Sequence, residues 1–236
     1  MKLLKLFLLA TLLYIPGVQA AEATDLNIKY SSNYLMPAYV HFQSDGFEYS
    51  IRANINVPLY NIQFTSKGAQ SSNFFNMLSY KDTRNNKPYA EAKIANRKIE
   101  YGKVKDGLKT EALTLPTYDL FTVAFQLSYY DKLPTSFQIT NGKKLYNVGG
   151  MRPVGSKTIS IAGGKTQINQ FTVQRGDNKK QIKYKKQDVT EITYQFKTGN
   201  KDIVVKKHEG EKFPRFISYS RDGDEYELTF SDFVKN

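Results

Sequence analysis

The stretch that decides the fold runs from residue 47 to residue 57 and reads FEYSIRANINV. Apolar residues alternate along it with charged, amide or hydroxyl residues, without a break. The apolar positions are Phe47, Tyr49, Ile51, Ala53, Ile55 and Val57. Since successive side chains of a β-strand point to opposite faces, this period of two predicts a strand with one buried face.

The alternation shifts by one residue after Pro58 and continues at Tyr60, Ile62 and Phe64. Proline cannot donate to the hydrogen-bond ladder of a sheet, so a proline at this change of phase predicts a bulge or a corner. A bulge would bring the later segment onto the same face as residues 47–57. We therefore expect the two segments to form one wall of a curved sheet.

The C-terminal half of the chain contains four pairs of turn-forming residues, each between short strand-like segments. These pairs are Asn141-Gly142, Gly163-Gly164, Gly199-Asn200 and Asp222-Gly223. Such pairs tolerate the positive φ that short hairpin turns need, and short connections force neighbouring strands to be antiparallel. This half is therefore predicted to be a meander.

One helix is predicted, over residues 117–130, with Thr117 as its N-cap and Asp119 in its first turn. Its apolar positions recur at spacings of three, four and seven: Leu120, Val123, Ala124 and Leu127. Residues 71–79 fit a helix or a strand. We see no internal repeat and no long linker. The sequence therefore predicts one all-β domain over residues 21–236, a strongly curved antiparallel sheet or partly open β-barrel of about ten strands with one short covering helix.

The first 20 residues resemble a bacterial export signal. Lys2 and Lys5 precede an almost entirely apolar run, and Val18-Gln19-Ala20 places small or aliphatic residues before the expected cleavage site. The apolar run is shorter than the ~20 residues that a membrane-spanning helix needs. We expect this segment to be a signal peptide, and the mature protein to be periplasmic and not an integral membrane protein.

The composition of the 236-residue chain limits its chemistry. The absence of cysteine excludes disulfides, cysteine-ligated zinc, iron–sulfur clusters and thiol catalysis. The two histidines, His41 and His208, have no neighbouring ligands at metal spacing, and no Gly-x-Ser-x-Gly motif is present. We expect no catalytic residue, metal or cofactor. A hydrolase that uses two carboxylates from different strands is the weaker alternative.

Basic residues outnumber acidic ones, 34 to 22, giving a formal net charge of +12. Such a balance favours anionic partners, and an exported protein is not expected to meet nucleic acid. The most basic stretch contains Lys179, Lys180, Lys183, Lys185 and Lys186. It fits a docking patch for anionic headgroups, and it also fits an edge strand that lysines protect against aggregation.

The chain is rich in aromatic residues, with 17 tyrosines and 15 phenylalanines. Tyrosine suits amphipathic grooves, and a curved sheet can hold an elongated apolar ligand. The expected cavity wall consists of Phe47, Tyr49, Ile51, Ala53, Ile55, Tyr60, Ile62 and Phe64. We predict a non-catalytic protein that binds a hydrophobic or anionic, lipid-like envelope component in this cavity. A structural or adaptor protein, docking an envelope partner through its basic face, is the alternative.

A family resemblance rests on the order of six segments. They are Val57-Pro58-Leu59-Tyr60-Asn61-Ile62, a strand with Gly68, Tyr80-Lys81-Asp82, Tyr118-Asp119-Leu120, Lys212-Phe213-Pro214-Arg215-Phe216-Ile217 and Tyr226–Phe230. In this order the chain resembles the bacterial domain of unknown function 3108. The resemblance implies an exported, mostly antiparallel β protein. It transfers no functional residue, because none of the segments is a catalytic motif.

Overall fold

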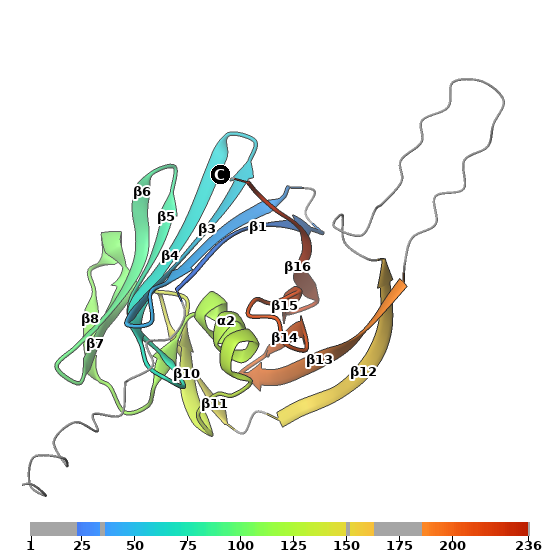
Figure 1. Cartoon of the computed structure of the whole chain (residues 1–236). Coiled ribbons are helices and arrows are strands. Elements are labelled where there is room, and N and C mark those ends of the chain that lie inside the picture. The colour runs from blue at the N-terminus through green and yellow to red at the C-terminus, as the bar shows by residue number, and fades with distance from the viewer. Residues whose placement is uncertain (1–22, 34–35, 150–151, 163–185, 236) are drawn as a thin grey trace, which may run out of the picture.

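A computed structural model of the chain describes residues 23–33, 36–149, 152–162 and 186–235. Thirteen antiparallel strands form one sheet in the order β12-β13-β14-β15-β16-β1-β2-β3-β4-β5-β6-β7-β8. The sheet curls around the α-helix α2 (Leu120–Tyr130), and a three-stranded sheet, β11-β10-β9, lies beside them (Figure 1). The predicted all-β class and strongly curved antiparallel sheet are confirmed.

The strand bounds divide the large sheet into two runs that meet where β16 pairs with β1. One run is β1 Thr24–Ser32, β2 Ala38–Ser44, β3 Glu48–Val57, β4 Tyr60–Gln70, β5 Phe75–Arg84, β6 Lys87–Ala95, β7 Lys98–Lys103 and β8 Lys109–Ala112. The other is β12 Arg152–Ala162, β13 Lys186–Thr198, β14 Lys201–His208, β15 Phe216–Arg221 and β16 Asp224–Phe233. The remaining elements are the 3-10 helix η1 Val104–Asp106, β9 Thr117–Tyr118, β10 Ser136–Thr140 and β11 Leu145–Gly149.

The strand predicted from the opening alternation is β3, and the change of phase after it is a hairpin turn. Only Pro58 and Leu59 separate β3 from β4, and Leu59 has a φ of 64°. The predicted bulge or corner at Pro58 is therefore wrong. The two segments still share a face because the hairpin pairs them directly, with Ala53 opposite Phe64.

Three of the four predicted hairpins are confirmed. Gly142, Gly199 and Gly223 have φ of 76°, 62° and 93°, in the turns β10–β11, β13–β14 and β15–β16. The Gly163-Gly164 pair lies outside the described residues. The ambiguous segment 71–79 leads into a strand, since β5 begins at Phe75.

A close approach at Gly68 contributes to the curvature of the sheet. The register between β4 and β5 shifts between Lys67 and Gly68. A Cβ at Gly68 would lie 2.0 Å from the backbone oxygen of Asn76, so no other residue fits there without movement of the backbone. Such irregularities increase the local twist of a strand pair and help a sheet to curl.

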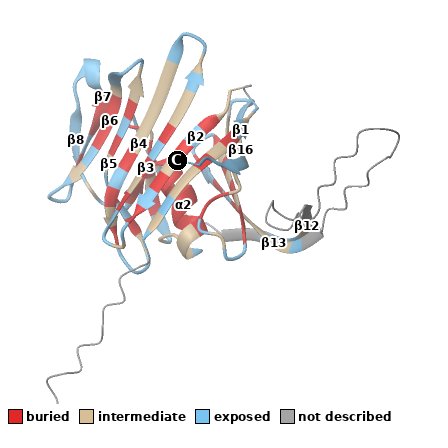
Figure 2. Ribbon diagram, turned by 45° about the horizontal axis from the view of Figure 1, so that its top comes forward, coloured by how far each residue is buried: buried red, intermediate tan, exposed pale blue. Residues whose placement is uncertain are grey.

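The helix differs from the prediction in its start and in its surroundings. Thr117 belongs to β9, and the N-cap is Asp119, whose carboxylate accepts hydrogen bonds from the backbone N–H groups of Phe121 (2.9 Å) and Thr122 (3.2 Å). Every residue from Phe121 to Ser128 is buried, so α2 does not cover one end of the sheet through a single apolar face. It is the centre of the core (Figure 2).

Side chains from the concave face of the sheet fill the space around α2. The ring of Phe42 on β2 stacks on that of Phe125 on α2, with 4.5 Å between centroids. Ile28, Val40, Val205 and other buried apolar residues complete this cluster. No helix in the described ranges is both long and apolar enough to cross a membrane.

Candidate functional site

The middle of the predicted cavity wall is part of the packed core. Tyr49, Ile51 and Ala53 are 3%, 1% and 0% exposed and belong to the same cluster as the side chains of α2. The hydroxyl of Tyr49 lies 3.3 Å from that of Thr122 on the helix. The space that the prediction left for a ligand beside these residues is therefore filled by α2, which the sequence had suggested would lie elsewhere.

The ends of the predicted wall have different surroundings. Phe47 is 66% exposed and precedes β3, so it does not share the inward face, and Tyr60 is 36% exposed at the β3–β4 turn. Ile55 and Ile62 form a half-buried cross-strand pair. Only Phe64 lines the pocket described next.

A pocket of about 610 Å³ lies at the N-terminal end of α2; we call it the α2 pocket. Its apolar and aromatic walls come from β4, α2, β10, β14, β15 and β16: Phe64, Phe121, Ile139, Ile203, Tyr219 and Tyr226. The volume and the mixed lining are typical of sites for small ligands. The pocket brings together side chains that lie up to about 160 residues apart in the sequence, which no local pattern can reveal.

Two buried carboxylates line the α2 pocket, and both have partners within the protein. Asp82 is 3% exposed and accepts hydrogen bonds from Nε (3.2 Å) and Nη2 (3.1 Å) of Arg84. Asp119 caps α2 and also accepts from the hydroxyl of Thr122 at 2.5 Å. Burial raises the pKa of Asp119 above its ordinary value, although hydrogen bonds from Ser66 and from the start of α2 act in the opposite direction.

Lys201, the first residue of β14, is the most unusual side chain of the pocket. It is 4% exposed, and its Nζ lies 3.4 Å from the ring centroid of Tyr146 and 5.3 Å from that of Tyr219. Within the described part of the chain, its ammonium forms no ion pair and donates no hydrogen bond. The sequence analysis missed Lys201, although strict alternation in β14 places it on the same inward face as Ile203 and Val205.

A second pocket, of about 750 Å³, adjoins the α2 pocket; we call it the basic pocket. Its charged lining consists of one acid, Asp106, and five lysines, Lys103, Lys109, Lys143, Lys144 and Lys201. Asn141, Lys143, Tyr146 and Lys201 line both pockets, which places the ammonium of Lys201 at their boundary. The arrangement joins an aromatic compartment to a compartment with a marked excess of positive charge.

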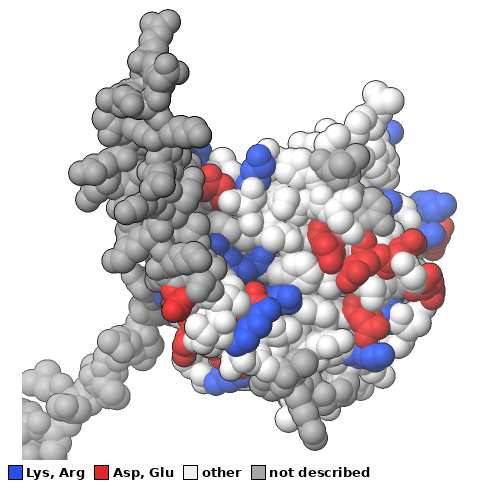
Figure 3. Space-filling model, turned by 90° about the vertical axis from the view of Figure 1, so that its right-hand side faces the viewer, with Lys and Arg blue, Asp and Glu red and all other residues white. Residues whose placement is uncertain are grey.

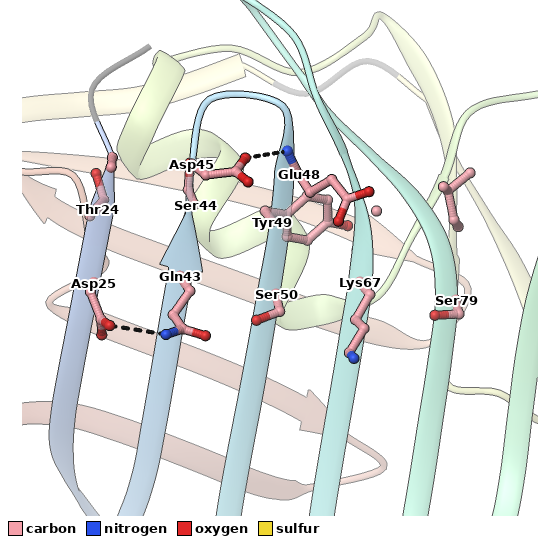
Figure 4. Close-up of a pocket in the computed structure, with 13 residues that line it drawn as sticks. Thr24, Asp25, Gln43, Ser44, Asp45, Glu48, Tyr49, Ser50, Lys67 and Ser79 are labelled. Carbon is pink, nitrogen blue, oxygen red and sulfur yellow. Dashed lines mark hydrogen bonds between the residues drawn. The ribbon is translucent and has the colours of Figure 1, made fainter. Parts of the chain in front are cut away.

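A third pocket, of about 680 Å³, crosses β1 to β5 and has few large apolar side chains in its lining (Figure 4). Figure 4 shows its strands in front of α2. Asp45 accepts hydrogen bonds from the backbone N–H groups of Phe47 and Glu48, which lower its pKa. Asp25 accepts from Gln43 at 2.9 Å and lies 2.9 Å from Nε2 of His41, and both contacts lower its pKa. These acids have partners inside the protein, so they offer little to a ligand.

Neither histidine belongs to a metal site in the described ranges, where no group of three or more potential ligands occurs. His208 lies 3.6 Å from a carboxylate oxygen of Glu211. Of the predicted basic patch, Lys179, Lys180, Lys183 and Lys185 lie outside the described residues, and Lys186 is the first residue of β13.

The positive charge is not spread evenly over the molecule. On the side that carries β12, β13 and β16, acidic side chains gather in one patch, with some lysines and arginines beside it and others in a separate group (Figure 3).

Comparison with known proteins gives no relative for this chain. No family model matches it, and neither a curated protein nor a solved structure is significantly similar. The resemblance to the bacterial domain of unknown function 3108 therefore stays a prediction.

Proposed function

We propose that this is a non-catalytic periplasmic protein that binds a lipid-like component of the cell envelope in the α2 pocket. The observation that supports this most is the pocket itself, in which aromatic and aliphatic side chains from both runs of the sheet surround a volume of about 610 Å³. The two other pockets are larger, but neither has as many aromatic and aliphatic side chains in its lining. The periplasmic location follows from the export signal predicted over residues 1–20.

We propose that the protein is non-catalytic because the two buried acids of the α2 pocket are held by partners within the protein. A carboxylate that acts as a general acid or base must be free to reach the substrate. Asp82 is held by Arg84, and Asp119 is held by the start of α2. The alternative of an adaptor that docks through Lys179–Lys186 depends on residues outside the described ranges, and no contact described above favours it.

A pair of matched variants tests the proposed function with an apolar naphthalene dye whose fluorescence rises on binding. Leu120→Trp adds volume to a half-buried residue of the α2 pocket, and Leu78→Trp adds the same ring to a residue that is 50% exposed in the third pocket. We expect the parent protein and Leu78→Trp to bind the dye equally, and Leu120→Trp to bind at least tenfold more weakly.

Thermal unfolding of both variants serves as the control that they are folded. A parent protein that does not bind the dye would contradict the proposed function. Loss of binding in Leu78→Trp alone would transfer the site to the other pocket and would equally contradict it.

A further inference from the structure

We propose that Lys201 recognises a phosphate group on the ligand, so that the α2 pocket takes a phosphate-bearing amphiphile whose headgroup faces the basic pocket. This inference rests on the proposed function and adds the chemical class of the ligand.

Burial of an ammonium group is costly unless partners replace the lost water. Lys201 is 4% exposed, and the partners that the described residues offer it are the ring faces of Tyr146 and Tyr219. Cation–π contacts recover part of the cost, and no described residue accepts a hydrogen bond from Nζ. Nζ is not one of the buried unpartnered atoms of the described residues, so its N–H donors face the open pocket. An anion in the pocket would accept those hydrogen bonds.

The basic pocket explains why a phosphate fits better than a single carboxylate. Four further lysines line it, against one aspartate, and none of the five lysines forms an ion pair with a described residue. Lys143 is half-buried with its Nζ 5.4 Å from the ring centroid of Tyr89, and Lys109 lies 5.0 Å from that of Tyr101. Lysine binds phosphate as a point charge, whereas planar carboxylates favour the fork of arginine.

The acids of the α2 pocket determine which way round the ligand lies. Four aspartates line the pocket. Asp82 is paired with Arg84, Asp119 caps α2, Asp222 accepts a hydrogen bond from Asn200, and Asp224 is exposed. Asp222 and Asp224 make their side of the pocket unfavourable for an anionic headgroup, whereas Lys201 and Lys143 attract it. The apolar part of the ligand would then lie against Phe64, Phe121, Ile203 and the rings beside them.

Calorimetric titration with three short-chain probes tests the inference: dioctanoyl phosphatidic acid, dioctanoylglycerol and inorganic phosphate. The first two have the same acyl chains and differ only in the phosphate. We expect the parent protein to bind the phosphatidic acid at least tenfold more tightly than dioctanoylglycerol, and inorganic phosphate more weakly than either.

Substitutions on β14 test whether Lys201 binds the phosphate group itself or acts only through folding or through the net charge of the protein. Lys201→Met should abolish the preference for the phosphatidic acid while keeping the affinity for dioctanoylglycerol, and Lys201→Arg should retain part of the preference. Lys206→Met removes the same charge from the other face of the strand, where Lys206 lies over Phe216, and should keep the full preference.

Each other result has a defined meaning. Equal affinity of the parent protein for both lipids would overturn the role of Lys201 and leave the proposed function intact. No binding of either lipid would contradict the proposed function itself. Binding of inorganic phosphate as tightly as the phosphatidic acid would overturn the amphiphile in favour of a free anion. Equal loss of both lipids in Lys201→Met, with unchanged Lys206→Met, would make Lys201 a purely structural residue.

Discussion

Both ends of α2 face the concave side of the same sheet, and each has a buried lysine of β14 beside it. The two lysines differ in the partners that the protein gives them. At the C-terminal end, Lys207 is 2% exposed and its Nζ donates hydrogen bonds to the backbone oxygen of Ser128 (2.7 Å) and to Asp131 (2.8 Å). The hydroxyl of Tyr194 donates to the same carboxylate at 3.0 Å. At the N-terminal end, the described contacts of the Lys201 ammonium are with the ring faces of Tyr146 and Tyr219, and a pocket opens beside it.

Lys201 and Lys207 can be compared directly because both belong to β14 and point to the same side of the sheet. The burial pattern of the strand alternates, with Lys201, Ile203, Val205 and Lys207 all buried. Lys207 supplies a cation where the helix dipole is negative and where backbone oxygens lack partners, which explains why it is buried. The same explanation fails for Lys201. The difference teaches that burial of a charged side chain marks a functional site only when the protein itself provides no counterpart.

The largest expected loss of stability is at Ala53, which packs against the middle of α2, between its two ends. Ala53→Trp inserts an indole into the packed space between β3 and α2, and we expect the free energy of unfolding to fall by about 3 kcal/mol, because overpacked cores must shift backbone and rotamers. Urea denaturation measures it. Leu120→Trp should lower the free energy of unfolding much less, because the α2 pocket has free volume for the added ring. Equal losses in the two variants would mean that the N-terminal end of α2 is as tightly packed as its middle.

The sequence could predict the sheet because its signals are local. Alternation over 47–57 predicts β3 with nearly correct bounds, and the Asn-Gly and Asp-Gly pairs predict the turns at Gly142 and Gly223. The position of α2 was not predictable in the same way. Its apolar face indicated a covering helix, whereas Phe121, Thr122 and Gln126 on its other sides are buried by strands distant in sequence.

The sequence could predict the chemical character of the candidate site but not the residues that form it. An aromatic-rich, basic chain indicated an apolar or anionic ligand, but the wall was placed on residues that instead contact α2. Phe64 is the one predicted residue that lines the α2 pocket. Lys201 and Tyr146 meet through the docking of the small sheet against the large one, and such a contact between sheets has no period in the sequence.

A smaller loss of stability is expected at Asp119, which caps the N-terminal end of α2 beside the α2 pocket. Asp119→Ala should lower the free energy of unfolding by about 1 kcal/mol, because two backbone N–H groups of α2 lose their acceptor. Asp119→Asn keeps an acceptor oxygen and should cost less at neutral pH. Urea denaturation of both variants distinguishes a capping role from a role in ligand binding, since the latter would leave stability unchanged in Asp119→Ala.

The pH dependence of the same variants sharpens this result. Because the folded-state pKa of Asp119 is raised above 3.8, the folded protein binds more protons than the unfolded chain between 3.8 and the raised pKa. The wild-type protein should therefore lose stability as the pH rises through this window, and the loss should be complete above it. Asp119→Asn lacks this titration, so its stability relative to wild type should increase over the window. A constant difference would contradict the raised pKa.

Lys207 stabilises the fold, whereas Lys201 is available to a ligand, and the stabilities of two variants distinguish these roles. The free energies of unfolding of Lys207→Met and Lys201→Met are determined in urea without any ligand. Lys207→Met should lose about 1–3 kcal/mol, because buried acceptors at the end of α2 are left unpaired. Lys201→Met should stay within about 1 kcal/mol of wild type, because loss of the cation–π contacts is offset by relief from desolvation. A loss in Lys201→Met as large as that in Lys207→Met would contradict the account.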